Sequence, residues 1–290
     1  MLEDATTTVE SPREFEYKSG AKPTWCPGCG DFGVLNAVYA ALREKGYNPK
    51  DVVAVSGIGC SSRLPFFVNT YGFHGLHGRA MPIATGLKAA NPDLQVLVFG
   101  GDGDAFAIGG DHFMHACRRN VDITYVVMDN ATYGLTKGQA SPTSRAGFIT
   151  KTTPAGAMEQ PVNPLALALI CGATYVAQGF SARPKDLTTL IVNGIEHRGF
   201  SFIEVFSPCP TFNKIDTFSY YKENIVDVPA EHDASNLGAA LQLATAVDII
   251  PTGLIYQRAV QTFGAGLRRQ LATGVLSREQ ALTKLFDRFS

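Results

Sequence analysis

The sequence has almost no net charge, because its 25 basic and 26 acidic side chains leave a formal charge of −1 over 290 residues. Proteins that bind nucleic acid or an anionic membrane surface usually carry a basic excess, so we expect neither partner here. No apolar run approaches the ~18–20 residues of a membrane-spanning helix. Residues 1–17 are polar and acidic, and they lack the basic start and apolar stretch of a signal peptide. We therefore expect a cytoplasmic location.

Internal repeats and low-complexity segments are also missing from the sequence. The length allows one large domain or two small ones, and a composition that is 45% hydrophobic and 18% charged is ordinary for a globular protein with a sizeable core. There are six cysteines. In a cytoplasmic protein they indicate metal or redox chemistry more than disulfides.

Helix-like and strand-like segments alternate along residues 31–206. Helical spacing predicts helices at Asp31–Lys45, Arg79–Ala90 and near 109–119, 163–171 and 184–197. Short apolar runs predict strands at Asp51–Ser56, 94–99, 123–128, Thr174–Ala177 and Ser201–Phe206. This alternation predicts an α/β fold, with a mostly parallel sheet covered by helices on both faces.

The remaining segments lack this alternation. Residues 1–24 are predicted to form an N-terminal arm, residues 25–214 one domain, and residues 215–290 a C-terminal extension. The stretch from 212 onward is predicted to be an extended tail with helices near 233–246 and 278–288. Residues 133–160 are rich in Gly, Pro, Thr and Ser. A loop that long inside a compact domain is usually functional.

Polar side chains follow two of the predicted strands. The run 94–99 leads into Gly-Gly-Asp-Gly-Asp, which includes Asp102, and the run 123–128 leads into Asp129 and Asn130. One helix fits between the two strands, so both strand ends come to the same edge of a parallel sheet, where α/β proteins bind ligands. Oxygen ligands there suit Mg²⁺, which commonly also binds phosphates. The sequence thus predicts a metal–diphosphate site, with two unrelated β-turns as the alternative.

The glycines on either side of Asp102 support this interpretation. Gly101 and Gly103 let the backbone turn sharply and approach a phosphate closely. A helix begins shortly afterwards, and the N-terminus of a helix favours negative charge.

Four cysteines lie where thiolates could meet. Cys26 and Cys29 form a Cys-Pro-Gly-Cys pair, Cys60 follows the first strand and Cys209 follows the last. Four thiolates suit a tetrahedral zinc ion or a [4Fe–4S] cluster, although zinc sites more often show two close pairs. A thioredoxin-like redox pair is a third possibility. The two other cysteines lie in helix-like apolar segments and are expected to be buried small hydrophobes: Cys117 and Cys171.

The Gly-Asp-Gly motif followed by Asn after this interval resembles the thiamine diphosphate motif. The resemblance assigns Mg²⁺ to the side chains of Asp102 and Asn130 and to the carbonyl of Thr132. Together with the four cysteines, the sequence resembles the β subunit of the 2-oxoacid:ferredoxin oxidoreductases. The resemblance runs from about Trp25 to Lys214. It is carried by the metal motif and by Trp25–Gly30, Gly57–Ser62, Gly75–Arg79, Tyr133–Gln139 and Pro208–Thr211.

The resemblance implies a thiamine diphosphate-binding fold and a [4Fe–4S] cluster held by Cys26, Cys29, Cys60 and Cys209. The implied reaction is oxidative decarboxylation of a 2-oxoacid with coenzyme A as co-substrate, with electrons passing through the cluster to ferredoxin; the direction of flux is left open. The residues implied to surround the cofactor are Ile58, Gly59, Cys60, His77, Gly101, Asp102, Gly103, Asp104, Asn130, Thr132, Gly134, Leu135 and Thr136.

A 2-oxoacid needs a cation for its carboxylate. By resemblance Lys137 faces the substrate, and Arg63 is a second candidate. A bidentate Arg would suit a distal carboxylate, which favours 2-oxoglutarate over pyruvate or a broad range of 2-oxoacids. The alternative for both cations is a solvated surface position. His77 is expected to contact the diphosphate or the reacting carbonyl, or to make a structural hydrogen bond, which is the better interpretation for His74.

One catalytic role has no candidate in the matched segments. Thiamine enzymes use a Glu to activate the aminopyrimidine, and between Trp25 and Gln139 the sequence offers only Glu44, on a helix face expected to be exposed. The resemblance implies that an α subunit supplies this Glu and coenzyme A contacts, in a dimer of αβ heterodimers. Two other classes of protein remain as alternatives. The cysteines argue against a non-redox thiamine decarboxylase, and the metal motif argues against an electron-carrier or zinc-stabilised module.

Overall fold

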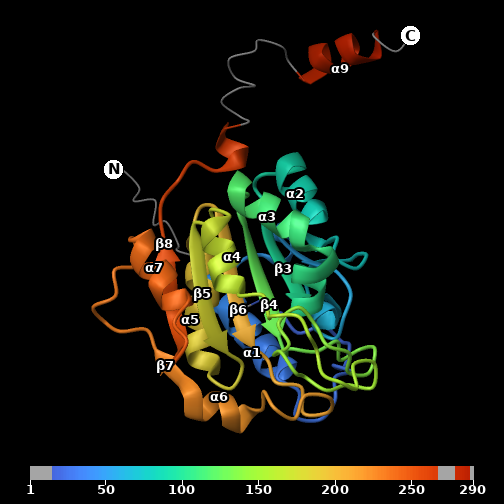
Figure 1. The fold of residues 1–290 in the computed structure, drawn as a ribbon. Helices are drawn as coiled ribbons and strands as arrows, with labels where there is room; N and C mark the ends of the chain where they lie inside the picture. Colours follow the sequence, from blue (N-terminus) through green and yellow to red (C-terminus); the bar gives the residue numbers. More distant parts are fainter. Residues whose placement is uncertain (1–14, 267–277, 288–290) are drawn as a thin grey trace, which may run out of the picture.

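A twisted sheet forms the centre of the protein (Figure 1), in a computed structural model that describes residues 15–266 and 278–287. Its strands lie in the order β2-β1-β3-β4-β6-β5-β8-β7, and all neighbours are parallel except β5 and β8. The strands are β1 (Val52–Ser56), β2 (Tyr71–His74), β3 (Gln95–Gly101), β4 (Ile123–Asp129), β5 (Tyr175–Phe180), β6 (Phe200–Phe206), β7 (Ile225–Asp227) and β8 (Ile250–Gln257).

Helices cover both faces of this sheet, as predicted. One core cluster packs α1 (Asp31–Lys45) and α5 (Pro184–Glu196) against the sheet. The other packs α2 (Ala80–Ala90), α3 (Gly110–Arg119), α4 (Pro164–Ile170) and α7 (Leu237–Ala244). The remaining elements are η1 (Pro49–Asp51), η2 (Ser61–Phe66), the π-helical turn η3 (Asp104–Ile108), α6 (Phe218–Asn224) and α9 (Arg278–Phe286).

The predicted alternation of elements is confirmed along residues 31–206, except that β2 was not predicted. Strand β4 is buried along its whole length, which is why an apolar run rather than an alternating pattern marks it. Strand β5 runs three residues beyond its predicted end at Ala177, through Gln178. The buried Gln178 side chain donates to Glu204 on the neighbouring β6 at 2.6 Å, which allows a polar residue to continue the strand inside the sheet.

The prediction of an extended tail after 212 is wrong for part of that segment. Residues 225–227 and 250–257 add β7 and β8 to the sheet, and α6 precedes them. Strand β8 was not predicted because it contains Pro251 and Gly253, and these residues argue against a strand except at an edge or a bulge. In the structure, β8 pairs with β5 through a bulge. The division between residues 214 and 215 stays a prediction. The first fourteen residues of the predicted arm lie outside the described residues.

Asn120 ties the C-terminal segment to the sheet. It ends α3 in the left-handed conformation, with φ 50°. Its side-chain oxygen accepts from Thr174 Oγ1 at 2.6 Å and from the Phe200 N–H at 2.8 Å. Its side-chain nitrogen donates to the carbonyls of Val260 and Gln261 at 3.2 and 3.3 Å. One side chain therefore joins a helix end, two strands and the segment after β8.

A third strand that the sequence analysis did not predict, β2, is short and lies at the sheet edge. All four of its residues are exposed, so no buried face marked it in the sequence. Among the described residues, no helix has both the length and the apolar character to cross a membrane.

Candidate functional site

The carboxyl ends of β1, β3 and β4 meet at one edge of the sheet and enclose a cavity of about 280 Å³. Every residue that the resemblance implied to surround the cofactor lines this cavity, and two more join them. The lining residues are Ile58, Gly59, Cys60, Ser61, His77, Gly101, Asp102, Gly103, Asp104, Asn130, Thr132, Tyr133, Gly134, Leu135 and Thr136. The topology therefore brings together segments that lie up to 78 positions apart in the sequence.

Asp102 lies at the floor of this cavity. It is 2% exposed, and Oδ2 accepts from Thr143 Oγ1 at 3.0 Å. Burial, and then the nearby Asp129 carboxyl, raise the pKa of Asp102 to about 8. A bound cation would favour the ionised form and reverse this shift. The residue thus has the chemistry of a metal ligand.

Asn130 and Thr132 face the same cavity from the segment after β4. Asn130 Oδ1 accepts from the Thr132 N–H at 3.1 Å, and the Thr132 carbonyl accepts from the Gly134 N–H at 3.0 Å. Both oxygens keep a second lone pair. Together with Asp102 they offer a hard-oxygen set that fits Mg²⁺.

Asp104 holds the cavity wall together. Its buried Oδ1 accepts from the backbone N–H groups of Ile58 at 2.9 Å and Gly78 at 2.7 Å, and it bonds His77 Nδ1 at 2.9 Å. Burial raises the pKa of Asp104, although these three donors oppose the shift. If His77 donates from Nδ1, its Nε2 is left as a neutral acceptor on a ring that lines the cavity. The carboxyl therefore fixes the orientation of both Ile58 and His77.

Close packing explains one glycine of the metal motif. A Cβ at Gly103 would lie 2.1 Å from the ring of Tyr133, so only glycine fits there. Tyr133 in turn begins the loop that carries Gly134 and Lys137.

Segments bearing four cysteines converge at the rim of the cavity. A Cβ at Gly134 would lie 3.7 Å from the sulfurs of both Cys60 and Cys209. The Trp25 indole donates to the Cys60 carbonyl at 2.6 Å, which brings the Cys26–Cys29 loop to the same place. Cys26 is exposed, Cys209 is buried and the other two are half-buried.

Two contacts fasten the Cys29 and Cys209 segments together. The Gly30 N–H donates to the Pro208 carbonyl at 3.1 Å, and a Cβ at Gly30 would lie 2.6 Å from Ser207 Oγ. Ser207 Oγ donates to the buried Asp31 carboxyl at 2.6 Å. The approach of the two backbones requires glycine at position 30. Burial, and then the Asp31 charge, raise the pKa of the Cys29 thiol and raise the pKa of Cys60 to about 11.

Four converging thiols are a possible donor set for a zinc ion or for a [4Fe–4S] cluster, in which each thiolate binds a different iron atom. Within residues 15–266 and 278–287, no group of three or more His, Cys, Asp or Glu side chains is arranged to hold a metal ion. Metal binding would also draw the protons from these thiols.

The remaining predicted site residues lie outside the cavity lining. Lys137 is exposed in the loop after the metal motif and has φ 79°, which is strained for a residue with a Cβ. Gln139 supports this turn, donating from Nε2 to the Thr136 carbonyl at 2.8 Å. Arg63 points toward the N-terminal arm, with Nη1 3.2 Å from Thr24 Oγ1. His74 bonds Ser56 Oγ at 3.0 Å, in agreement with a structural role.

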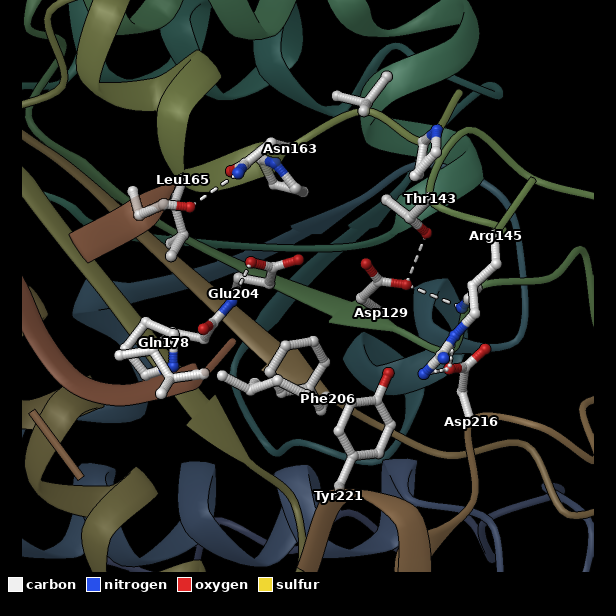
Figure 2. A pocket seen from close by; sticks show the side chains of 18 of the residues that line it. Asp129, Thr143, Arg145, Asn163, Leu165, Gln178, Glu204, Phe206, Asp216 and Tyr221 are labelled. Atoms are coloured by element: carbon white, nitrogen blue, oxygen red, sulfur yellow. Dashed lines mark hydrogen bonds and ion pairs between the residues drawn. The ribbon is translucent and has the colours of Figure 1, made fainter. Parts of the chain in front are cut away.

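A second cavity, of about 390 Å³, lies on the other side of the segment after β4 (Figure 2). Asp129 and Ala131 line it, whereas Asn130 and Thr132 line the first cavity. Figure 2 shows the carboxyl groups of Asp129 and Glu204 facing each other. Burial, and then the Glu204 charge, raise the pKa of Asp129, and burial raises the pKa of Glu204 to about 7.

The sequence did not reveal Thr143 or Glu204 as parts of this region. Thr143 Oγ1 lies 2.8 Å from Asp129 and 3.0 Å from Asp102, so it links the two cavities. Its only sequence signal was its place in the long loop at 133–160. Glu204 lies within the apolar run of β6, where a lone polar residue gave no signal.

Two domain families match the chain. "Thiamine pyrophosphate enzyme, C-terminal TPP binding domain" matches residues 36–205, which include the strand ends that line the first cavity. The C-terminal domain of the pyruvate ferredoxin oxidoreductase beta chain matches residues 209–270.

Individual proteins are similar over most of this chain. The 2-oxoacid:ferredoxin oxidoreductase 2 subunit beta of Aeropyrum pernix is 43% identical over 253 residues, covering 83% of this chain and 82% of that protein. The 2-oxoglutarate oxidoreductase subunit KorB of Mycobacterium tuberculosis is 46% identical, covering 71% of this chain and 56% of that protein. A solved structure, described as 2-oxoglutarate:ferredoxin oxidoreductase from Magnetococcus marinus with 2-oxoglutarate, coenzyme A and succinyl-CoA bound, superposes with a TM-score of 0.89 at 51% identity, covering 93% of this chain and 94% of the other.

Proposed function

This chain belongs to the β subunits of the 2-oxoacid:ferredoxin oxidoreductases, and we propose that it binds thiamine diphosphate, Mg²⁺ and a [4Fe–4S] cluster to oxidise 2-oxoglutarate with coenzyme A. The family and the thiamine-binding domain follow from the matches to known proteins. The substrate, the cluster and the residue roles are inferences from the site.

One observation carries the proposal most directly. Gly134 lies in the lining of the cofactor cavity, and a Cβ built on it would lie 3.7 Å from the sulfurs of Cys60 and Cys209. A cluster on these thiols would therefore border the bound cofactor. When bound, thiamine diphosphate supplies a nucleophilic carbon and an electron sink for decarboxylation, and a neighbouring cluster supplies a one-electron acceptor.

The residues of this chain would position those groups. Asp102, Asn130 and the Thr132 carbonyl would hold Mg²⁺ against the diphosphate. Asp104 would keep His77 turned toward the cavity and the Ile58 backbone beneath it. The four cysteines, Cys26, Cys29, Cys60 and Cys209, would hold the cluster at the rim. Leu135 and Thr136 would exclude water beside the reacting carbon.

Two considerations favour 2-oxoglutarate as the substrate. The Mycobacterium tuberculosis relative is named a 2-oxoglutarate oxidoreductase, and the Magnetococcus marinus structure is described with 2-oxoglutarate bound. Lys137 is exposed in the loop that also lines the cavity, so its ammonium could reach a substrate carboxylate. The geometry favours Lys137 over Arg63, because Arg63 is held by Thr24 and does not line the cavity.

The α subunit would complete the active site. None of the described residues that line the cavity is a Glu, and Glu44 is exposed on α1. A partner chain must therefore bring the carboxylate that activates the aminopyrimidine. We infer that the α subunit supplies it, together with contacts to coenzyme A, and that ferredoxin accepts the electrons.

Anaerobic purification of the chain with its α subunit tests the proposal. We expect a visible iron–sulfur spectrum, about four irons per chain, and reduction of ferredoxin that requires 2-oxoglutarate, coenzyme A and thiamine diphosphate together. Pyruvate and a branched 2-oxoacid are the comparison substrates. A protein that contains zinc and no iron would contradict the redox part of the proposal. Faster turnover of pyruvate would contradict the substrate.

A further inference from the structure

The surface around the cysteine loop has an unusual distribution of charge. Four segments surround the cysteines: 17–30, 57–64, 131–151 and 205–215. Together they contain seven Lys and Arg residues. Four carboxylates border these segments, of which Glu16 is exposed and the other three are buried: Asp31, Glu204 and Asp216. The exposed charges beside the cysteines are therefore mostly basic.

Three exposed or half-exposed cations lie close to the exposed Cys26. Arg63 donates to Thr24, two positions before Cys26. Lys214 donates to the Pro210 carbonyl, and Pro210 Cγ lies 3.8 Å from where a Cβ of Gly28 would be. Lys22 is exposed on the arm just before Thr24. We call Lys22, Arg63 and Lys214 the cysteine-side basic surface.

These cations keep their charge for an outside partner. In the part of the chain that the structure describes, none of the three forms an ion pair with a carboxylate. Arg145 differs, because it is paired with Asp216 at 2.6 Å. A group of unpaired cations of one sign attracts an acidic partner over a distance of about 10 Å at moderate salt.

We propose that the cysteine-side basic surface docks the acidic protein that carries electrons away, with the exposed Cys26–Gly28 loop at the centre of the contact. The inference rests on the proposed function and adds the docking site and its mode of recognition. Each docking event would move one electron from the reduced cluster to the oxidised carrier, with no proton or atom transferred. Two carriers are therefore needed for the two electrons released by each substrate.

Physical reasons favour a carrier protein at this surface. Cys26 is the exposed member of the four cysteines, so the cluster would come nearest to solvent here. Electron-transfer complexes are small and short-lived, and charge complementarity speeds their formation more than it strengthens them. Three cations around an exposed loop are enough for such steering.

Charge reversal on this surface tests the inference in the intact αβ complex. The test variant combines Lys22→Glu with Lys214→Glu. The matched control combines Lys50→Glu with Arg119→Glu, because these two exposed cations, for which the structure records no ion pair among the residues it describes, precede β1 and β4 at the opposite edge of the parallel sheet. Lys22→Glu alone serves as a second variant, since Lys214 contacts the residue after Cys209. Iron content and thiamine diphosphate affinity verify that each variant is intact.

Three measurements decide the outcome. At low salt, the second-order rate constant for reducing an acidic ferredoxin should fall at least about tenfold in the test variant and less than about twofold in the control. The dissociation constant of oxidised ferredoxin, measured without turnover by calorimetry, should rise in parallel, and both effects should shrink as salt is added. Reduction of a small uncharged dye should stay unchanged.

Two results would overturn the docking site. One is ferredoxin reduction by the test variant at the wild-type rate and salt dependence. The other is failure of the test variant, but not of the control, to assemble with the α subunit, which would assign this surface to the interface between α and β. If the wild-type complex reduced neither ferredoxin nor the dye, the proposed function itself would be contradicted.

Discussion

The Asp102 carboxyl is buried, and burial raises its pKa to about 8. A bound cation would favour its ionised form. We expect Asp102→Ala to abolish measurable thiamine diphosphate binding in the presence of Mg²⁺, because one of the three proposed metal ligands is removed. Calorimetric titration of the cofactor measures this loss, and circular dichroism verifies the fold. Asp93→Ala removes an exposed aspartate and is the control. Retained binding by Asp102→Ala would refute the metal assignment.

Glu204 gives a prediction about pH. Burial raises its pKa from 4.5 to about 7 in the folded protein, so the folded state holds the proton more tightly than the unfolded chain. The protein without cofactor is then most stable below about pH 4.5 with respect to this group, and stability falls as pH rises toward 7. Glu204→Gln keeps an acceptor for Gln178 and removes the titration.

The free energy of unfolding of both proteins is compared between pH 5 and 7. We expect its decrease over this range to be smaller in Glu204→Gln than in the wild type, and the two decreases should differ by on the order of 1–3 kcal/mol. Urea denaturation at several pH values measures the difference. Equal pH dependence in the two proteins would show that the shift is absent.

Lys137 provides a test of substrate binding. Lys137→Met removes the charge while keeping a long side chain at a position with positive φ, and Lys137→Arg keeps the charge. If the ammonium pairs with a substrate carboxylate, kcat/KM for 2-oxoglutarate should fall roughly 10- to 100-fold in Lys137→Met, which corresponds to about 1.4–2.8 kcal/mol. Lys137→Arg should be affected less. Unchanged kcat/KM in both would place Lys137 outside the site.

At the scale of elements, the packing of the C-terminal segment depends on Asn120. Asn120→Gly keeps a residue that tolerates φ 50° but removes four hydrogen bonds, whereas Asn120→Ala also adds backbone strain of about 1 kcal/mol. We expect losses of roughly 2–3 kcal/mol for the Gly variant and more for the Ala variant. Urea denaturation compares them with Asn224→Ala, which alters an exposed asparagine in α6. A loss no larger than that of the control would show that Asn120 is not the link described.

The elements differ in how well the sequence predicted them, for physical reasons. Strands β3 and β4 are buried on both faces, so their apolar runs and the polar residues after them marked the fold and the metal site together. Helix α1 was predicted to the residue, because Gly46 ends it in the left-handed conformation. Strand β2 is exposed along its length, so no buried apolar run marks it in the sequence. Strand β8 contains Pro and Gly and pairs with β5 through a bulge, so it lacks the apolar run of a regular strand.

The site residues followed the same division. Asp102, Asn130 and the four cysteines stand in motifs, and the fold brings their segments together. Asp31 and Thr143 act through hydrogen bonds to segments 176 and 41 positions away, and no local pattern reports such a pair. The orientation of Arg63 toward Thr24 could not be predicted from the sequence either, because it depends on where the N-terminal arm lies.

At the scale of the whole molecule, we propose that this chain forms half of an active site, in which bound thiamine diphosphate would lie beside a cluster that accepts its electrons. The purified β chain should accordingly bind iron and yet show no turnover of 2-oxoglutarate. Addition of the α subunit should restore turnover, because the cavity then gains the missing Glu. Full activity from the β chain alone would contradict this division of the site.

Electron paramagnetic resonance of the αβ complex tests that claim most directly. The complex is mixed anaerobically with 2-oxoglutarate in the absence of ferredoxin, with and without thiamine diphosphate. We predict the signal of a singly reduced [4Fe–4S] cluster that requires substrate, thiamine diphosphate and the α subunit, and that is lost in Asp102→Ala. A complex that releases CO₂ from 2-oxoglutarate without ever reducing a cluster would contradict it.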